Sequence, residues 1–189
     1  MKKIYLVAFI VVIVLSGVYA QNIPTTGPNT SIRFEDALAI KGKLYVKEFF
    51  PIPTDFDFSF KAEIGRLFFP ETGHRVYALK LTTDYYKSKI DSGKTTVILD
   101  ESEIKSVIDS INYMKNFMEK LKGNEPYTEV IYKSSGNFTF GFYAASDERK
   151  YFIDVNNKET RFYYEERLGE IEQFFFSVVD KVAELKETM

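Results

Sequence analysis

The sequence predicts an α+β fold built from two β-sheet-plus-helix repeats, written (βββ(β)α)x2, in which each antiparallel sheet is covered by the helix at its C-terminal end. Two observations lead to this class. Short segments with apolar residues at every second position, separated by turn residues, precede each of two long amphipathic segments. The composition is globular, since 45% of the 189 residues are hydrophobic and 25 Lys and Arg stand against 27 Asp and Glu.

The N-terminus has the pattern of a secretory signal peptide. Lys2 and Lys3 precede the apolar run 4–15, and Val18-Tyr19-Ala20 fits the small-residue site of a signal peptidase. A retained membrane anchor is the alternative, but the apolar run has 12 residues, whereas a bilayer-spanning helix needs about 20. We therefore expect residues 1–20 to be removed and the product to be exported, periplasmic or extracellular, with no transmembrane segment.

The exported chain would begin at Gln21 and contain 169 residues. Without Lys2 and Lys3 it has 23 Lys and Arg against 27 Asp and Glu, a formal charge of −4. Residues 21–31 are polar and contain two prolines, which predicts a flexible leader. A first unit over 32–123 and a second over 124–189 follow, packed together as one globular domain.

The first unit begins with a helical pattern at 33–40 and continues with strands. Alternating apolar residues predict a half-buried strand over 56–64, which Gly65 ends. A turn at 91–93 and a β-branched strand at 95–99 complete the sheet. The remaining predicted strands are 43–50, 66–69 and 75–82.

Asp100 is the predicted N-cap of the first long helix. Glu103 stands three positions later, where its carboxylate can reach the backbone N–H of Asp100 in a capping box. Gly123 is the expected C-terminal stop. Between them, apolar residues recur at helical spacing, namely Ile104, Val107, Ile108, Ile111, Met114, Met118 and Leu121.

The second unit repeats this order. Strands are predicted over 128–133, 138–142, 151–155 and 160–164, and a helix over about 165–186. A constant shift of 64 residues also matches the last turn and strand of the two units, which favours an internal duplication over two unrelated units. The same shift carries the first apolar helix face onto Leu168, Ile171, Phe175, Val178, Val182 and Leu185.

This doubled order over residues 43–186 resembles the PUR-repeat and whirly-type single-strand nucleic-acid-binding proteins, whose fold is a doubled ββββα. The resemblance is architectural, without a family motif, so it transfers no functional residue. It implies single-strand nucleic-acid binding as an alternative function. Tyr85 and Tyr86 beside Lys87 and Lys89 are the local candidate, but an ordinary solvated hairpin explains them, and the charge of −4 disfavours a phosphate-binding groove.

The composition excludes several chemistries. The absence of Cys excludes disulfides, thiolate metal sites and a cysteine nucleophile, and the single histidine, His74, excludes a multi-histidine site. No GxSxG, P-loop, GxGxxG or HExxH motif occurs. Adjacent carboxylates at Asp100 and Glu101, and at Glu165 and Glu166, leave a carboxylate-dependent hydrolase as a second alternative, although helix N-termini favour such charges anyway. We expect no catalytic residue, cofactor or metal.

Aromatic residues are the remaining candidates for a ligand or partner surface. In the run 174–176, Phe175 belongs to the inner stripe of the helix, so Phe174 or Phe176 must face elsewhere. Packing between the repeats would explain them in purely structural terms. The surface residues that we predict are Phe49, Phe50, Tyr85, Tyr86, Phe174 and Phe176.

By elimination, the sequence favours an exported, non-enzymatic binding or protein-interaction module. Its partner would be an unknown protein or small ligand, with nucleic acid disfavoured and a homodimer left open. An apolar cleft or patch between the repeats would distinguish this hypothesis. A nucleic-acid binder would instead show a contiguous positive surface, and a hydrolase a strongly raised carboxyl pKa in a cleft.

Overall fold

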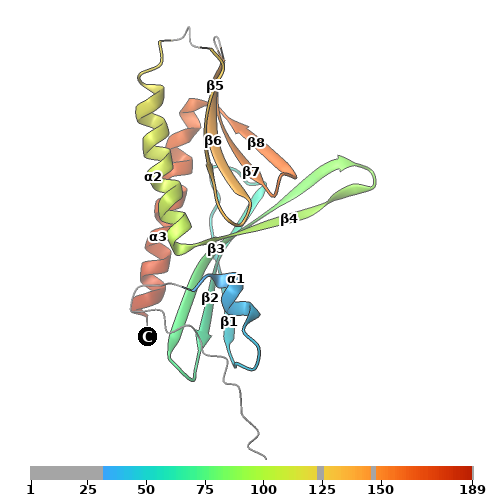
Figure 1. The fold of residues 1–189 in the computed structure, drawn as a ribbon, viewed down its shortest axis with the longest axis vertical. Coiled ribbons are helices and arrows are strands. Elements are labelled where there is room, and N and C mark those ends of the chain that lie inside the picture. Colours follow the sequence, from blue (N-terminus) through green and yellow to red (C-terminus); the bar gives the residue numbers. More distant parts are fainter. Residues whose placement is uncertain (1–31, 123–125, 146–147, 189) are drawn as a thin grey trace, which may run out of the picture. The chain divides into compact units, whose positions relative to one another are not determined.

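Two four-stranded antiparallel sheets, each followed by a long helix, make up the fold (Figure 1). The computed structural model describes residues 32–122, 126–145 and 148–188, so the predicted signal peptide, leader and Gly123 stop lie outside the described residues. The predicted α+β class with its twofold repeat is confirmed. The elements are α1 (Phe34–Ala39), β1 (Val46–Ile52), β2 (Phe60–Phe69), β3 (His74–Ser88), β4 (Asp91–Asp100), α2 (Glu101–Met118), β5 (Thr128–Lys133), β6 (Phe138–Ala145), β7 (Glu148–Val155), β8 (Glu159–Tyr163), a 3-10 turn (Glu165–Arg167) and α3 (Leu168–Glu187).

Sheet A has the strand order β1-β2-β3-β4, and sheet B has the order β5-β6-β7-β8. The turn predicted at 91–93 is wrong, because these residues belong to β4 and the β3–β4 hairpin reverses beyond the pair Ser88 and Asp91. β2 pairs with β3 only as far as Thr83. The ends of β3 and β4 therefore continue past the sheet as a two-stranded arm, seen as the green hairpin in Figure 1.

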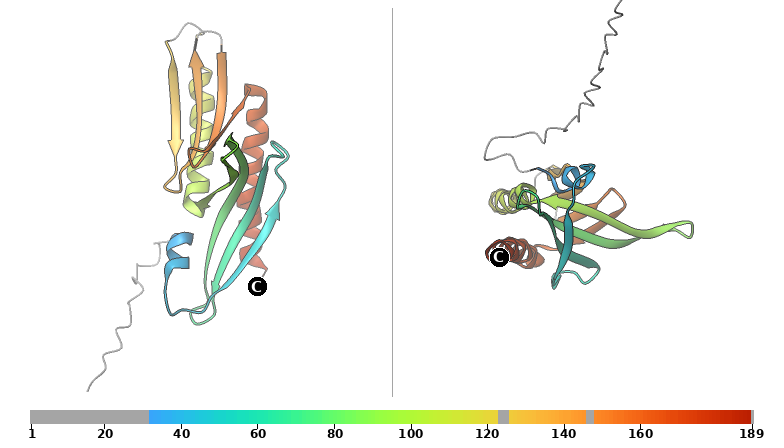
Figure 2. Two further views of the ribbon diagram at one scale, coloured as in Figure 1. Left: turned by 90° about the vertical axis from the view of Figure 1, so that its right-hand side faces the viewer. Right: turned by 90° about the horizontal axis from the view of Figure 1, so that it is seen from below.

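The helices α2 and α3 lie side by side and run antiparallel (Figure 2). Lys115 near the end of α2 pairs with Glu172 near the start of α3 at 2.8 Å, and Glu101 at the start of α2 pairs with Lys186 near the end of α3 at 2.5 Å. Each helix contacts both sheets, so the two helices form one layer that both sheets share. No helix of the described ranges is both long and apolar enough to cross a lipid bilayer.

One hydrophobic core joins the inner faces of both sheets to the two helices. Phe138, Phe140 and Phe142 alternate along β6 and are fully buried, in agreement with the predicted strand pattern. Since the chain contains no cysteine, no disulfide adds to the stability that burial of this aromatic core supplies. The buried helix residues shared with the predicted stripes are Ile104, Val107, Ile108, Ile111, Met114, Met118, Leu168, Ile171, Phe175, Val178, Val182 and Leu185.

The strand predicted over 56–64 is wrong at its start. Residues 56–59 form a loop because Asp57 reverses the chain there. Its carboxylate accepts the Ser59 N–H at 2.9 Å, and its carbonyl oxygen accepts the Phe60 N–H at 3.1 Å. Such local side-chain bonds compete with strand pairing, and an alternating apolar pattern does not reveal them.

Gly65 lies in the middle of β2 and does not end it, because an aromatic ring occupies the space above it. A Cβ at this position would lie 2.7 Å from Cζ of Phe34. Phe34 and Ala37 of α1 cover this outer face of sheet A and form a small second core. The buried strand residues of that core are Leu67, Phe69, Val76 and Ala78.

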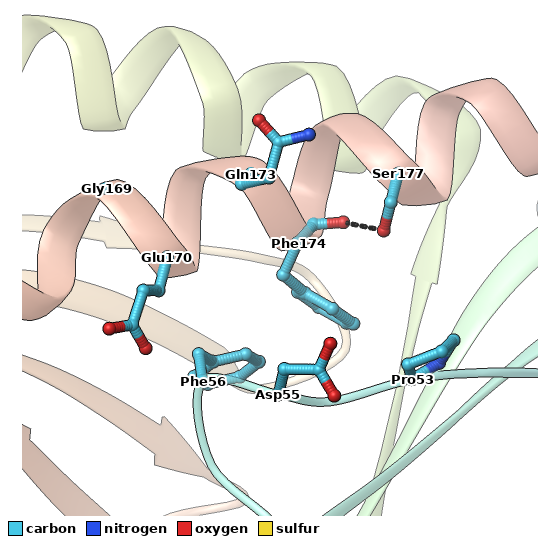
Figure 3. A pocket seen from close by; sticks show the side chains of 8 residues that line it. All are labelled: Pro53, Asp55, Phe56, Gly169, Glu170, Gln173, Phe174 and Ser177. Carbon is cyan, nitrogen blue, oxygen red and sulfur yellow. Dashed lines mark hydrogen bonds between the residues drawn. The ribbon is translucent and has the colours of Figure 1, made fainter.

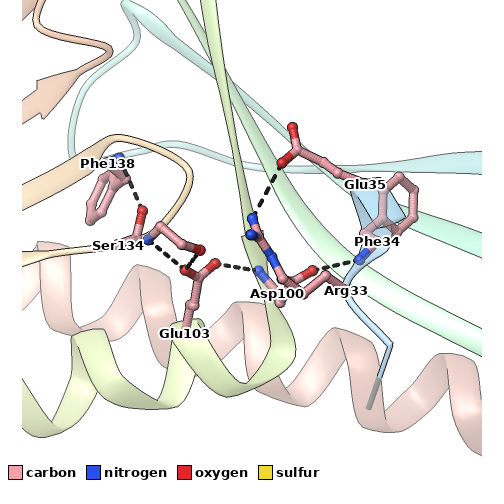
Figure 4. Close-up of polar contacts among 8 residues, drawn as sticks. Arg33, Phe34, Glu35, Asp100, Glu103, Ser134 and Phe138 are labelled. Atoms are coloured by element: carbon pink, nitrogen blue, oxygen red, sulfur yellow. Dashed lines mark hydrogen bonds and ion pairs between the residues drawn. The ribbon is translucent and has the colours of Figure 1, made fainter. Parts of the chain in front are cut away.

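The capping box predicted at Asp100 and Glu103 is present, and it also positions α1 (Figure 4). Oε2 of Glu103 accepts the Asp100 N–H at 3.0 Å. The Asp100 carboxylate accepts the Phe34 N–H at 2.8 Å and the Nε–H of Arg33 at 3.1 Å. The junction between β4 and α2 therefore holds α1 against sheet A.

The same junction binds the second half of the chain. The other oxygen of Glu103 accepts the backbone N–H of Ser135 at 2.8 Å and the hydroxyl of Ser135 at 2.5 Å. Next to Ser135, a Cβ on Gly136 would lie 2.5 Å from the carbonyl oxygen of Ile98 in β4. The β5–β6 turn thus packs backbone to backbone against sheet A.

This close approach predicts that Gly136→Ala destabilises the protein by about 2 kcal/mol, since the clash is with backbone that has little room to move. Gly169→Ala in α3 is the matched control, because a Cβ there meets nothing within 4 Å. Gly169→Ala should leave the free energy of unfolding unchanged or raise it by about 0.5–1 kcal/mol. Urea unfolding followed by circular dichroism measures both free energies, and equal values for the two variants would contradict this packing.

Candidate functional site

A groove lies between the β1–β2 loop and α3, so both halves of the chain line it (Figure 3). Its volume is about 430 Å³ and its lining is mostly apolar. An apolar cleft between the two halves is the feature that would distinguish the binding-module hypothesis from its alternatives. The lining residues are Pro53, Asp55 and Phe56 from the loop and Gly169, Glu170, Gln173, Phe174 and Ser177 from α3.

The floor of the groove consists of two buried aromatic rings. Phe56 and Phe174 lie with ring centroids 4.9 Å apart, and Phe174 also contacts the ring of Phe175 at 5.2 Å. Figure 3 shows Phe174 and Glu170 pointing from α3 toward the loop. The floor is therefore formed by contact between the halves, and each half supplies one ring.

Contacts from the second half hold the loop in its conformation. The hydroxyl of Tyr163 in β8 donates to the Asp57 carboxylate at 2.7 Å, and the guanidinium of Arg167 donates to the carbonyl oxygen of Phe56. Within the loop, the Thr54 hydroxyl donates to the carbonyl oxygen of Phe60 at 2.6 Å. The groove is thus formed before any ligand enters it.

The rim of the groove carries an excess of negative charge. Arg167 pairs with Glu170 at 2.9 Å, whereas no residue within the described ranges forms an ion pair with Asp55. At Gly169, in the first turn of α3, the space above the backbone is open. An apolar floor beside an unpaired carboxylate suits an occupant with an apolar part and a cationic group.

The carboxyl groups with shifted pKa values do not favour a general acid. Burial alone would raise the pKa of Asp57, but hydrogen bonds from Ser59 and Tyr163 outweigh it and hold the pKa below its ordinary value. Hydrogen bonds from lysines also lower the pKa of Glu63 and of Glu148. Because a catalytic acid needs a raised pKa, these directions give the hydrolase hypothesis no support.

The outer face of sheet B carries a second candidate surface. Four rings form a continuous chain of contacts, in which Tyr127 lies 6.2 Å from Tyr143, Tyr143 lies 6.1 Å from Phe162, and Phe162 lies 6.2 Å from Phe152. A hollow of about 380 Å³ lies among these side chains. Antiparallel sheets usually turn a polar face to water, so this aromatic face is an unusual solvent-facing surface. We call it the sheet B outer face.

Of the predicted surface residues, Phe49 and Phe50 lie on opposite faces of β1. Phe49 is exposed and sits between the ammonium groups of Lys80, 4.7 Å from its ring centroid, and Lys47, 5.8 Å away. Phe50 packs against the main core beneath the guanidinium of Arg66. Neither contributes to the lining of the groove.

Tyr85 and Tyr86 lie on the arm formed by β3 and β4. Lys158 from the β7–β8 turn lies over the Tyr85 ring at 4.5 Å and donates to its hydroxyl at 3.2 Å, while Tyr86 is largely exposed. On α3, Phe174 is buried in the groove floor and Phe176 is 41% exposed. The structure therefore brings only Phe174 of the six predicted residues into the groove.

The residues that sequence reasoning missed carry a local signal. Adjacent side chains of a strand point to opposite faces, so two neighbouring aromatics cannot both enter one core. Phe142-Tyr143, Tyr151-Phe152 and Phe162-Tyr163 are such pairs in three consecutive strands. One member of each pair lies in the core and the other on the sheet B outer face.

Part of the positive charge of sheet A is offset by a carboxylate. On its outer face, Glu63 pairs with Lys61 at 2.9 Å and with Lys80 at 3.0 Å. This pairing gives the nucleic-acid hypothesis no support there. Within the described ranges, no group of three or more His, Asp or Glu side chains is placed to hold a metal ion.

The Asp57 contact predicts a pH dependence of stability. A carboxyl with a lowered pKa in the folded state stabilises the protein above its unfolded pKa of about 3.9, and that stabilisation is lost as the pH falls through the folded value. Asp57→Asn should destabilise the protein by about 1 kcal/mol at pH 7. The difference should begin to shrink below about pH 4, where the unfolded carboxyl takes up a proton, and should vanish only as the pH falls through the lowered pKa of the folded carboxyl. Urea unfolding at pH 7 and in the acid range tests this, and a difference independent of pH would contradict an ionised role for Asp57.

The chain matches no protein-family model, and no curated protein and no solved structure matches it. The candidate site therefore rests on the geometry of the groove and of the sheet B outer face.

Proposed function

We propose that this protein is an exported, non-enzymatic interaction module that binds a polypeptide segment of a partner protein in the groove between the β1–β2 loop and α3. The segment would place a large apolar side chain on Phe56 and Phe174 and a Lys or Arg beside Asp55. The observation that carries this proposal is the groove itself, because both halves line it and its loop is fixed by Tyr163 and Arg167. Pre-formed sites lose less ordering entropy on binding.

The form of the groove favours an extended segment over an enclosed small molecule. Its helical wall runs from Gly169 to Ser177, which is about 12 Å at 1.5 Å per residue. Three or four residues of an extended chain cover this length. Phe58, in the same loop, is 87% exposed and offers further apolar contact to a partner beside the groove.

The charge distribution favours a basic partner. Removal of residues 1–20 would leave a formal charge of −4, and Asp55 adds an unpaired carboxylate at the rim of the groove. Opposite charge accelerates encounter and fixes the register of binding. Lys2 and Lys3, followed by a short apolar run, support the proposal that the protein is exported and binds its partner outside the cytoplasm.

Peptide selection on the exported form tests the groove. A displayed library of random peptides should yield sequences that combine a large apolar residue with Lys or Arg. Gly169→Gln would place a side chain over the groove, and glutamine is a better helix former than glycine. This change should weaken binding of the selected peptides at least tenfold, about 1.4 kcal/mol. Asp55→Asn should weaken binding less and reduce its dependence on salt.

Two controls keep this test specific. Gly169→Ala adds one methyl group and should retain most of the binding. Asn112→Gln changes a residue of α2 that does not line the groove and should have no effect. Selection of acidic peptides, or undiminished binding by the Gly169→Gln variant, would overturn the proposal.

Export predicts a defined N-terminus. Protein purified from the periplasm or medium of a bacterial expression host should begin at Gln21 and have the mass of 169 residues. Replacing Ala20 by a bulky residue should block cleavage, because signal peptidases require a small side chain there. Intact-mass spectrometry reads both results, and a wild-type product that retains Met1 would refute the signal-peptide assignment.

A further inference from the structure

The two sheets can be compared position by position on their outer faces. In sheet A the paired row Phe49, Gly65, Ala78 and Asp100 crosses the outer face from β1 to β4, and in sheet B the paired row Glu129, Tyr143 and Lys150 crosses the outer face from β5 to β7. In sheet A, α1 lies on this region and its Phe34 ring covers Gly65. Among the described residues, no helix lies on the corresponding region of sheet B.

Sheet B nevertheless carries an apolar row next to this region. Ile131, Gly141, Phe152 and Phe162 lie opposite one another on β5, β6, β7 and β8. A Cβ on Gly141 would lie 2.6 Å from the Phe152 ring, so that ring lies flat on the sheet. Ile131 and Phe162 remain 51% and 57% exposed. The row is thus a flat apolar band that lacks the cover that α1 gives sheet A.

Four charges flank the apolar row in an alternating arrangement. Glu129 and Lys150 lie in the row on one side of it, and Lys133 and Asp154 lie in the row on the other side. Glu129 and Lys133 share β5, and Lys150 and Asp154 share β7. Each strand therefore carries one positive and one negative side chain, at opposite ends of the band.

This arrangement is complementary to itself. A twofold axis along the apolar row superposes the band on the band of a second copy and exchanges the two charged rows. Glu129 then faces Lys133 of the other copy. Lys150, which also pairs with Glu148 of its own chain at 2.5 Å, faces Asp154, so Glu129 and Asp154 each meet an ammonium group. The same axis sets the large Tyr143 opposite the small Thr139, which allows the two faces to interdigitate.

We propose that the sheet B outer face is a homodimer interface in which two copies pack face to face about this axis. This surface lies apart from the groove beside α3 and takes a different occupant. Four strands about 4.8 Å apart and about 20 Å long offer roughly 400 Å² per copy. Stable interfaces bury about 800 Å² per partner, so the dimer is weak and forms at micromolar concentrations.

Sedimentation of the exported form from about 1 to about 200 µM should show a monomer–dimer equilibrium. Phe162→Lys should raise the dissociation constant at least tenfold, because it buries a charge in the apolar row. Phe176→Lys is the matched control, since Phe176 is a similarly exposed phenylalanine on α3, and it should leave the equilibrium unchanged. Circular dichroism checks that each variant is folded.

A charge exchange tests the geometry of the dimer. Glu129→Lys alone and Lys133→Glu alone each place like charges opposite one another and should weaken the dimer about threefold to tenfold. The double variant restores opposite charges and should recover dimerisation. A chain that stays monomeric throughout, a dimer that survives Phe162→Lys, or single charge variants equal to wild type would each overturn the proposal.

Discussion

Two carboxylates at the junction of β4 and α2 join parts of the fold that lie far apart in the sequence. Asp100 accepts hydrogen bonds from Arg33 and Phe34, and Glu103 accepts them from Asp100 and Ser135. Both lie at the N-terminus of α2, where the helix dipole stabilises negative charge. The position of α1 on sheet A and the position of the β5–β6 turn against β4 both depend on this junction. It also gives a chain without cysteine a polar link between its halves.

The features that the sequence predicted correctly are those decided by neighbouring residues. The capping box and the buried helix stripes depend on spacings of three and four residues, and they appear where predicted except at Leu121, which lies beyond the end of α2 at Met118. The errors arise where distant residues decide. The sequence pattern predicts that Gly65 ends a strand, but Gly65 lies inside β2, because the Phe34 ring packs on it. The pattern of residues 56–59 predicts a strand, but these residues form a loop. The Asp57 carboxylate accepts hydrogen bonds there from Ser59 and from Tyr163, which lies 106 residues away in the sequence.

The candidate surfaces show the same limit. The prediction selected aromatics by their density in the sequence, and those residues lie on an edge strand, on the arm and on two sides of α3. The groove could not be foreseen, because Phe56 and Phe174 meet only after the two halves pack together. The sheet B outer face could have been predicted from neighbouring residues in the sequence. Three adjacent aromatic pairs in consecutive strands require that one ring of each pair leaves the core.

The groove and the sheet B outer face meet at one short edge strand. In β8, Tyr163 points inward and its hydroxyl holds Asp57 in the loop of the groove, whereas Phe162 points outward into the aromatic face. A displacement of β8 would therefore move the loop of the groove through Tyr163 and the aromatic face through Phe162. If binding in the groove shifts the dimer equilibrium, dimerisation has to shift groove affinity by the same factor, because the coupling free energy is shared by both sites. Among the described strands, β8 pairs with β7 alone, so fewer hydrogen bonds resist movement of β8 than resist movement of a central strand.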